Sequence, residues 1–143
     1  MSIPIHTAIS PDKIAACYPV MRQLRPELEE ARFVERVRNQ QEIQNYYLIY
    51  AEEEGVVVAA AGYRFIDNLH MGFHLYVDDL VTDEAKRGNG YGQALMAWLE
   101  REARRAGCTS LHLDSGTQRH PAHRLYIRSG MDIVYYHFRK LLD

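Results

Sequence analysis

The chain has 143 residues, of which 47% are hydrophobic and 25% are charged, and its formal net charge is −2 at pH 7. This length is enough for one domain with a single buried core, so we expect residues 1–143 to form one domain. The slightly acidic charge argues against a nucleic-acid partner, because such partners require a basic surface.

Two further features of composition bear on location. No apolar run approaches the length of a membrane span, and the N-terminus lacks the pattern of a secretion signal, so we expect no membrane partner. The two cysteines, Cys17 and Cys108, are isolated and lack the spacing of metal ligands. Such sparse cysteines are typical of free thiols in a reducing compartment, which predicts a cytoplasmic protein.

The N-terminal part of the sequence predicts one strand and two helices. Ile3–Ile9 alternates loosely, as a strand does, and a serine and a proline then begin a helix within residues 11–24. Pro19 predicts a kink or a break in that helix, and Arg25-Pro26 ends it. Apolar residues recur at helical spacing over Glu27–Gln41, which predicts a second helix with its other face in water.

The middle of the chain predicts a hairpin and a central strand. Tyr46–Ala51 and Val56–Phe65 are rich in β-formers and are joined by Glu52–Gly55, which we interpret as a solvated turn rather than a lure for substrate. Residues 66–73 form the next connection. His74–Thr82 is then expected to be the central strand.

The C-terminal part predicts two helices and two strands. Gln93–Ala106 is an amphipathic helix whose apolar face must cover a sheet, and Ser110–Asp114 follows as a strand parallel to the central one. Pro121–Ser129 is a further short helix, and Ile133–Leu141 is a final strand. Together the elements predict an α/β (α+β) protein with a mixed sheet of six or seven strands and about four helices on both faces.

A glycine-rich turn connects the central strand to the amphipathic helix. In Arg87-Gly88-Asn89-Gly90-Tyr91-Gly92, three alternating glycines let the backbone approach a ligand and leave the first helical N–H groups pointing outward. The helix dipole and Arg87 both favour an anion, so the turn predicts a phosphate site. Gln93 stands where a dinucleotide fingerprint requires its third glycine, and the end of a Walker loop is absent.

The turn resembles the Arg/Gln-x-x-Gly-x-Gly/Ala motif of the GNAT superfamily of acyl-CoA-dependent N-acyltransferases, with Arg87, Gly90 and Gly92 at its fixed positions. The acidic and aliphatic pairs of residues 78–81 precede it as in the family's strand along the pantetheine arm. Downstream, Ala122–Met131 is similar to the family's Ala-x-x-x-Tyr-x-Lys/Arg-x-Gly-Phe segment, with methionine in place of the usual phenylalanine. The resemblance covers the C-terminal half strongly and the N-terminal half by topology.

This resemblance implies a GNAT-like sheet splayed between strands four and five and direct acetyl transfer from acetyl-CoA, a co-substrate, to a primary amine, without a metal. Backbone groups freed by the splay would hold the pantetheine arm and polarise the thioester, and the glycine-rich turn would hold the diphosphate. An arginine in the Tyr126 segment is a candidate for the 3′-phosphate. The residues assigned to the co-substrate are Leu80, Val81, Thr82, Arg87, Gly88, Asn89, Gly90, Tyr91, Gly92 and Arg128.

Three residues are candidates for the chemistry. Tyr126 matches the tyrosine that protonates the departing thiolate, and a neutral phenol can do so at pH 7; the alternative is a core aromatic residue. Asp78 matches the position of the family's proposed base, and Asp79 is the second candidate, because burial in a strand should raise a carboxyl pKa. The period of a strand places the two aspartates on opposite faces. The alternative is that both carboxylates only bond backbone N–H groups at a bulge.

Several alternatives stay open at this point. His120 and His123 with Asp114 suggest a metal site, which we discount because His-x-x-His alone is a weak signal. Arg119 stands where many members carry an asparagine, so that contact is not assigned. A small-molecule amine is the expected acceptor, with a protein or peptide acetyltransferase and a non-catalytic acyl-CoA sensor as alternatives. Pairing of the final strand across a twofold axis would give a homodimer.

Overall fold

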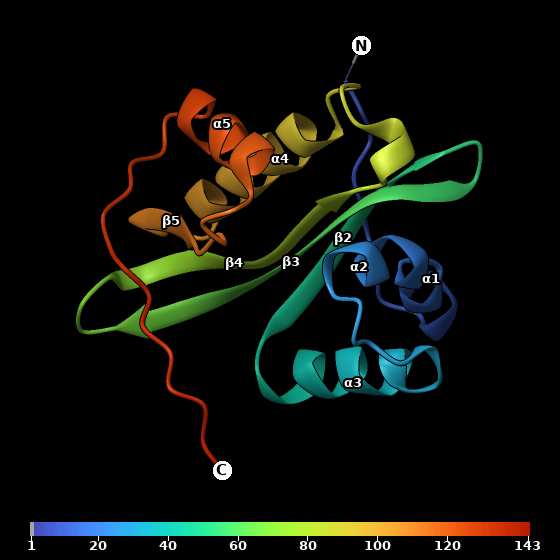
Figure 1. Cartoon of the computed structure of the whole chain (residues 1–143), viewed down its shortest axis with the longest axis horizontal. Coiled ribbons are helices and arrows are strands. Elements are labelled where there is room, and N and C mark those ends of the chain that lie inside the picture. The colour runs from blue at the N-terminus through green and yellow to red at the C-terminus, as the bar shows by residue number, and fades with distance from the viewer. Residues whose placement is uncertain (1) are drawn as a thin grey trace. The chain divides into compact units, whose positions relative to one another are not determined.

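The computed structural model describes residues 2–143 and divides the chain into two compact units, Met1–Leu113 and Asp114–Asp143. The first unit contains one sheet with its covering helices (Figure 1). Its elements are β1 (His6–Thr7), α1 (Pro11–Ala16), α2 (Tyr18–Leu24), α3 (Glu30–Ile43), β2 (Tyr46–Glu53), β3 (Val56–Asn68), β4 (Gly72–Thr82), the 3-10 helix η1 (Glu84–Lys86), α4 (Tyr91–Arg105) and β5 (Ser110–Leu113). The second unit contains α5 (His120–Arg128).

The sheet of the first unit has five strands in the order β1-β2-β3-β4-β5. Strands β1 to β4 are antiparallel neighbours, and β5 runs parallel to β4, so the predicted mixed sheet is confirmed with fewer strands than the six or seven expected. Pairing between β4 and β5 extends only from His74 to Val77, although β4 continues to Thr82. The edge of β4 over residues 78–82 therefore has no partner in β5, which is the predicted splay between strands four and five.

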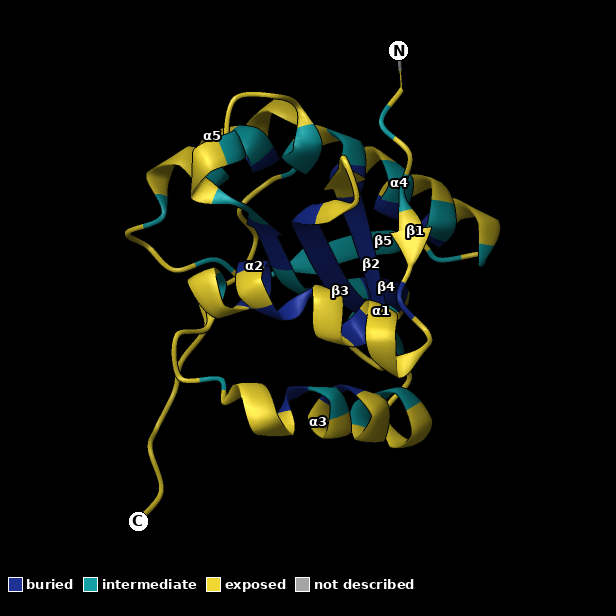
Figure 2. Ribbon diagram, turned by 90° about the vertical axis from the view of Figure 1, so that its right-hand side faces the viewer, coloured by how far each residue is buried: buried dark blue, intermediate teal, exposed yellow. Residues whose placement is uncertain are grey.

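Helices cover both faces of this sheet. Figures 1 and 2 show α1, α2 and α3 on one face and α4 on the other, with the buried strands between them. Alternate residues of β2 divide between the two layers: Tyr46 and Leu48 join the core formed with α1, α2 and α3. On the opposite face, Trp98 of α4 packs edge-on against Tyr63 of β3. In residues 2–143, no helix has both the length and the apolar character required to cross a bilayer.

Two local differences from the expected elements have clear physical reasons. The break between α1 and α2 falls at Cys17 and not at Pro19, because a proline is well tolerated in the first turn of a helix. The predicted connection 66–73 is largely strand: Ile66 pairs with His74, and the pairing continues to Asn68 and Gly72. Cross-strand pairing thus extends the hairpin beyond what residue types alone indicate.

In the second unit, residues 131–143 form no helix or strand, so the prediction of a final strand over Ile133–Leu141 is wrong. Its composition favours a strand, but β-propensity reflects packing on a pleated, half-buried surface, and no strand pairs with this segment. Its large apolar side chains are exposed: Ile133, Val134, Tyr135, Tyr136, Phe138, Leu141 and Leu142.

The two cysteines differ in accessibility, which gives a first prediction. Cys17 is fully buried, and burial raises the pKa of its thiol to about 12, whereas Cys108 is partly exposed. Because thiolates are the reactive form, we expect Ellman's reagent at about pH 8 to titrate only Cys108 in the native protein and both cysteines in guanidinium chloride. A Cys108→Ser variant should show no fast thiol, and fast reaction of both native thiols would contradict this.

Candidate active site

The glycine-rich turn has the geometry of an anion site. Gly88 and Gly90 adopt φ values of +85° and +86°, which other residues reach only with strain, and Gly90 is the N-cap of α4 without a side-chain cap. Ala94 N–H bonds the Gly90 carbonyl at 3.0 Å. Within residues 2–143, no acceptor bonds the N–H groups of residues 91–93 ahead of it. Three open donors at the positive end of a helix fit a phosphate group.

Side chains from two other elements hold this turn in place. Tyr91 donates a hydrogen bond to Glu53 at the end of β2 (2.7 Å), and Lys86 forms an ion pair with the same carboxylate (3.1 Å). These contacts, the Tyr91 hydrogen bond first, lower the pKa of Glu53. Glu53, beside the acidic turn between β2 and β3, thus helps to hold the glycine-rich turn in place. Arg87 is exposed, and no described residue pairs with it, so its guanidinium is available to an anion.

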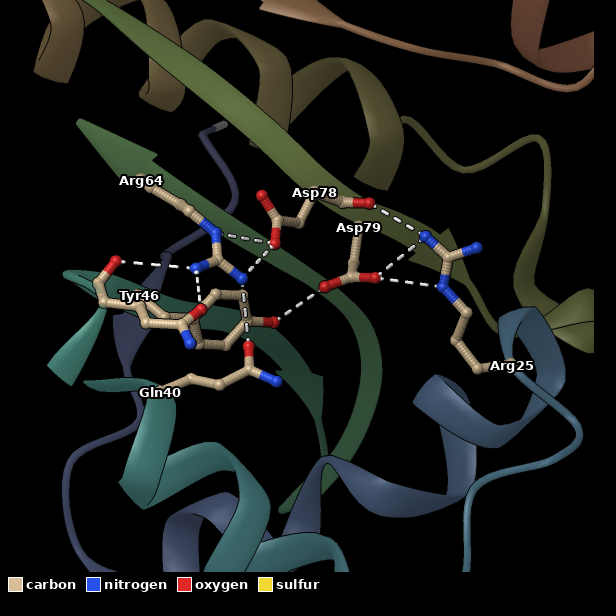
Figure 3. Close-up of polar contacts among 7 residues, drawn as sticks. Arg25, Gln40, Tyr46, Arg64, Asp78 and Asp79 are labelled. Carbon is tan, nitrogen blue, oxygen red and sulfur yellow. Dashed lines mark hydrogen bonds and ion pairs between the residues drawn. The ribbon is translucent and has the colours of Figure 1, made fainter. Parts of the chain in front are cut away.

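On the strand before the turn, a β-bulge brings the two aspartates together. In the β3–β4 register, Gly62 pairs with Asp79 and Tyr63 pairs with Val77, so Asp78 is the extra residue. A bulge interrupts the alternation of side chains. Both carboxylates therefore line one hollow of about 510 Å³, and the expectation that they point to opposite faces is wrong (Figure 3). The residues lining it are Arg25, Arg64, Ile66, Tyr76, Asp78 and Asp79.

Asp78 is held by a fully engaged arginine. Its Oδ2 accepts hydrogen bonds from Nε and Nη2 of Arg64, at 2.8 and 2.6 Å. The remaining donors of Arg64 bond the side-chain oxygens of Gln40 and Gln44 near the end of α3, at 3.0 and 2.8 Å. The guanidinium also lies 5.3 Å from the ring centre of Tyr46. Oδ1 of Asp78 has no partner among the described residues, so one oxygen of this carboxylate is open.

Asp79 is more deeply buried and has different partners. Its side chain is 13% exposed, Oδ2 accepts a hydrogen bond from Tyr46 Oη (2.8 Å), and Oδ1 accepts one from Arg25 Nε (3.1 Å). Burial raises the pKa of Asp79, although the Tyr46 hydrogen bond and the charge of Arg25 act in the opposite direction. The bulge is present, but the partners of both carboxylates are side chains and not the backbone N–H groups considered as the alternative.

A glycine makes the Tyr46–Asp79 contact possible. Tyr46 is buried on β2 beside Gly62 of β3, and a Cβ at Gly62 would overlap the tyrosine ring and hydroxyl. The roles of Tyr46, Gly62, Arg25 and Arg64 were not predicted from the sequence. A glycine inside a strand was the available signal, since it often marks a close approach. No local sequence pattern indicated which residues these four contact.

The remaining predicted residues are distributed over both units. Leu80, Val81 and Thr82 continue β4 past its last pair with β5, beside the two aspartates. Tyr126 and Arg128 lie on α5 in the second unit. Burial raises the pKa of Tyr126, and the neighbouring Arg119 opposes this effect.

The histidines considered as metal ligands have a local contact. A ring nitrogen of His123, Nε2, lies 2.7 Å from the carbonyl oxygen of Gly116. Over the described range, no group of three or more His, Cys, Asp or Glu side chains is placed to hold a metal ion. His123 thus contacts the loop that precedes its own helix.

Comparison with known proteins identifies the family and supports the fold. Residues 14–131 match the acetyltransferase (GNAT) family. A solved structure described as a transcriptional regulator from Bacillus halodurans has the same fold, with a TM-score of 0.84, 21% identity and coverage of 98% of this chain and 99% of that one. The chain therefore belongs to the GNAT family of acetyltransferases and is an acyltransferase.

Two relatives in sequence carry more specific names. The chain is 36% identical over 132 residues to the uncharacterized N-acetyltransferase YhdJ of Bacillus subtilis, covering 92% of this chain and 93% of the relative. It is 38% identical over 82 residues to the aminoalkylphosphonate N-acetyltransferase of Salmonella typhimurium, covering 52% of this chain and 53% of that protein. Both names describe N-acetyltransferases, the class to which this protein is assigned.

The contact between Gly62 and Tyr46 gives a second prediction. We expect Gly62→Ala to destabilise the protein by about 1–3 kcal/mol, as overpacking in a core does. Denaturant unfolding measures the change. A Tyr46→Ala background removes the three atoms nearest to the added methyl group, so the same substitution should cost much less there. Equal losses in both backgrounds would show that the ring does not set the requirement for glycine.

Asp79 gives a third prediction, on stability as a function of pH. Its pKa is raised on folding above the unfolded value of about 3.9, so the native state binds the proton more tightly. The contribution of Asp79 to stability is present below that value and is lost as pH rises through the folded pKa. We expect the stability of the wild type relative to Asp79→Asn to fall from about pH 4 towards neutrality. Denaturant unfolding across this range measures it, and a relative stability that rises would reverse the sign.

Proposed function

We propose that the protein transfers an acetyl group from acetyl-CoA directly to the primary amine of a small molecule, with both substrates bound together. The observation that carries this proposal is the succession along one stretch of chain: two carboxylates in a hollow, an unpaired strand edge, and an anion-binding turn. These three features correspond to an amine site, a pantetheine site and a diphosphate site.

The residues present fit the co-substrate. Acetyl-CoA supplies an acetyl group already activated as a thioester. Backbone groups of Leu80, Val81 and Thr82 would bond the pantetheine amides, and one N–H on this edge would polarise the thioester carbonyl. The open N–H groups at the start of α4, with Arg87, would bind the diphosphate. Arg128 on α5 is the proposed contact for the 3′-phosphate.

For the amine, we assign different roles to the two aspartates. The family resemblance favours Asp78 as the base, but the partners of each carboxylate favour Asp79. Burial gives Asp79 a raised pKa, so it accepts a proton more readily than an ordinary carboxylate. The open Oδ1 of Asp78 would orient the ammonium group before its proton moves to Asp79, directly or through one water. Tyr126 would return a proton to the departing thiolate.

A small-molecule acceptor is supported by the size of the hollow and by one relative. Pockets for small ligands commonly measure about 300–1,000 Å³, and this one measures about 510 Å³. The relative from Salmonella typhimurium is named for a small amine, an aminoalkylphosphonate.

The fourth prediction concerns activity. With acetyl-CoA and a panel of primary amines, thiol release should show turnover, and Asp79→Asn should lower kcat/KM by about 10²- to 10⁴-fold, the range for loss of a general base. We expect Asp78→Asn to act mainly through KM. Asp67→Asn, an exposed carboxylate on β3 outside the hollow, is the matched control and should leave the rate unchanged.

Two results would change this assignment. If Asp79→Asn retained the wild-type rate while Asp78→Asn lost it, the base would be Asp78. If the protein bound acetyl-CoA tightly but acetylated no amine, the alternative of a non-catalytic acyl-CoA sensor would replace the enzyme.

A further inference from the structure

The two arginines of the hollow differ in how fully they are used. Every nitrogen of the Arg64 guanidinium donates to Asp78, Gln40 or Gln44, and the side chain is 19% exposed. Arg25 is 44% exposed and bonds the protein through Nε, to Asp79, and Nη2, to the Asp78 carbonyl at 2.9 Å. Its Nη1 bonds no described residue and points away from both carboxylates (Figure 3). Of these two arginines, only Arg25 has a guanidinium nitrogen that bonds no described residue.

The position of Arg25 follows from the sequence. It is the residue before Pro26, and a residue in that position is pushed out of the helical region of backbone space. Arg25 accordingly ends α2 with φ −124° and ψ 79°. Its side chain reaches the hollow from this end of α2, whereas Arg64 is fixed between β3 and α3. A partly exposed side chain at a helix end can change partners with little disturbance of the core.

The charge of the hollow favours a particular kind of ligand. Two aspartates and two arginines line it, so their formal charges cancel. A simple cationic amine would add an uncompensated charge to this balanced set. A ligand that carries both an ammonium group and an oxyanion leaves the balance intact, because each charge meets an opposite one.

We propose that Arg25 binds an oxyanion of the acceptor, so that the acceptor is a small zwitterion with its amine at Asp78 and Asp79 and a phosphonate, phosphate or carboxylate at Arg25. The guanidinium fork suits such groups, since it can donate two parallel hydrogen bonds to them. This assignment rests on the proposed acetyl transfer and specifies its substrate. It makes Arg25 a residue that determines specificity rather than a participant in the proton transfer.

A consequence for Asp79 follows. Asp79 contacts Tyr46 on β2 and Arg25 at the end of α2. The charges of Asp78, beside it on β4, and of Arg64 on β3 also interact with its carboxylate. Of these, Arg25 lowers the pKa of Asp79 by its charge. When Arg25 turns towards an oxyanion, this effect weakens and the carboxylate gains proton affinity. Binding of the correct acceptor thus prepares the base that must take its proton.

The fifth prediction compares three acceptors of similar size: 2-aminoethylphosphonate, β-alanine and propylamine. We expect the wild type to prefer one of the two anionic amines. Arg25→Ala should lower kcat/KM for that amine by about 10- to 100-fold, as loss of a charge-assisted hydrogen bond does, chiefly through KM. Propylamine has no oxyanion, so its kcat/KM should be unchanged at pH values above the acid limb. The acid limb itself should move to higher pH, because Asp79 loses the charge of Arg25 that lowers its pKa.

Two further variants separate recognition from general damage. Arg25→Lys keeps the charge without the fork and should restore part of the loss. Arg22→Ala removes the same charge from an exposed position on α2 that does not line the hollow, and should behave as the wild type. The two anionic acceptors also distinguish a tetrahedral phosphonate from a planar carboxylate. Thermal unfolding of each variant verifies that it is folded.

A binding measurement makes the inference independent of turnover. No transfer can occur without acetyl-CoA, and calorimetry under this condition should show that 2-aminoethylphosphonate binds the wild type and Arg22→Ala but not Arg25→Ala. If it does so while no amine is acetylated, the anion site stands and the proposed function fails. If Arg25→Ala binds 2-aminoethylphosphonate and acetylates the anionic amines like the wild type, or loses activity on propylamine equally, the role of Arg25 is overturned while acetyl transfer stands.

Discussion

The extra residue in β4 is the constraint on which the rest of the site depends. In a regular strand, Asp78 and Asp79 would face opposite sides of the sheet, and one carboxylate would point away from Arg64 and Arg25. A buried charge without a partner is strongly unfavourable. The bulge places both carboxylates on the side where Arg64 and Arg25 lie. The one extra residue of the bulge thus allows both carboxylates to pair with arginines.

The contacts around the bulge favour function over stability. Replacing a buried ion pair by apolar residues is often neutral or stabilising, so such a network is weak evidence for a stabilising role. Here Tyr46 occupies the space that Gly62 leaves free, and its hydroxyl donates a hydrogen bond to Asp79. Even with these partners, the net effect of the surroundings is to raise the pKa of Asp79. Asp79 is therefore incompletely compensated, which is the property that its proposed role as a base requires.

The sequence predicted the features that depend on neighbouring residues and missed those that depend on distant ones. Glycines at 88 and 90 need positive φ whatever surrounds them, so the turn and the start of α4 were predictable. The bulge was not, because register depends on β3 as well as on β4. Tyr46 and Arg25 reach Asp79 from 33 and 54 residues away in the chain, and no local pattern records such contacts. The expected final strand failed for the same reason, since a strand requires a partner.

The end of α2 connects the two halves of the site. Gln23 donates to the Asp83 carboxylate at 3.3 Å and accepts a hydrogen bond from the Glu84 N–H at 3.0 Å, which fixes the chain just before the glycine-rich turn. Two residues later, Arg25 contacts the carboxylates of the hollow. Gln23 and Arg25 are two residues apart at the end of α2, so this short segment contacts both the chain before the glycine-rich turn and the aspartates. A displacement of α2 would therefore move the glycine-rich turn and the hollow of the two aspartates together.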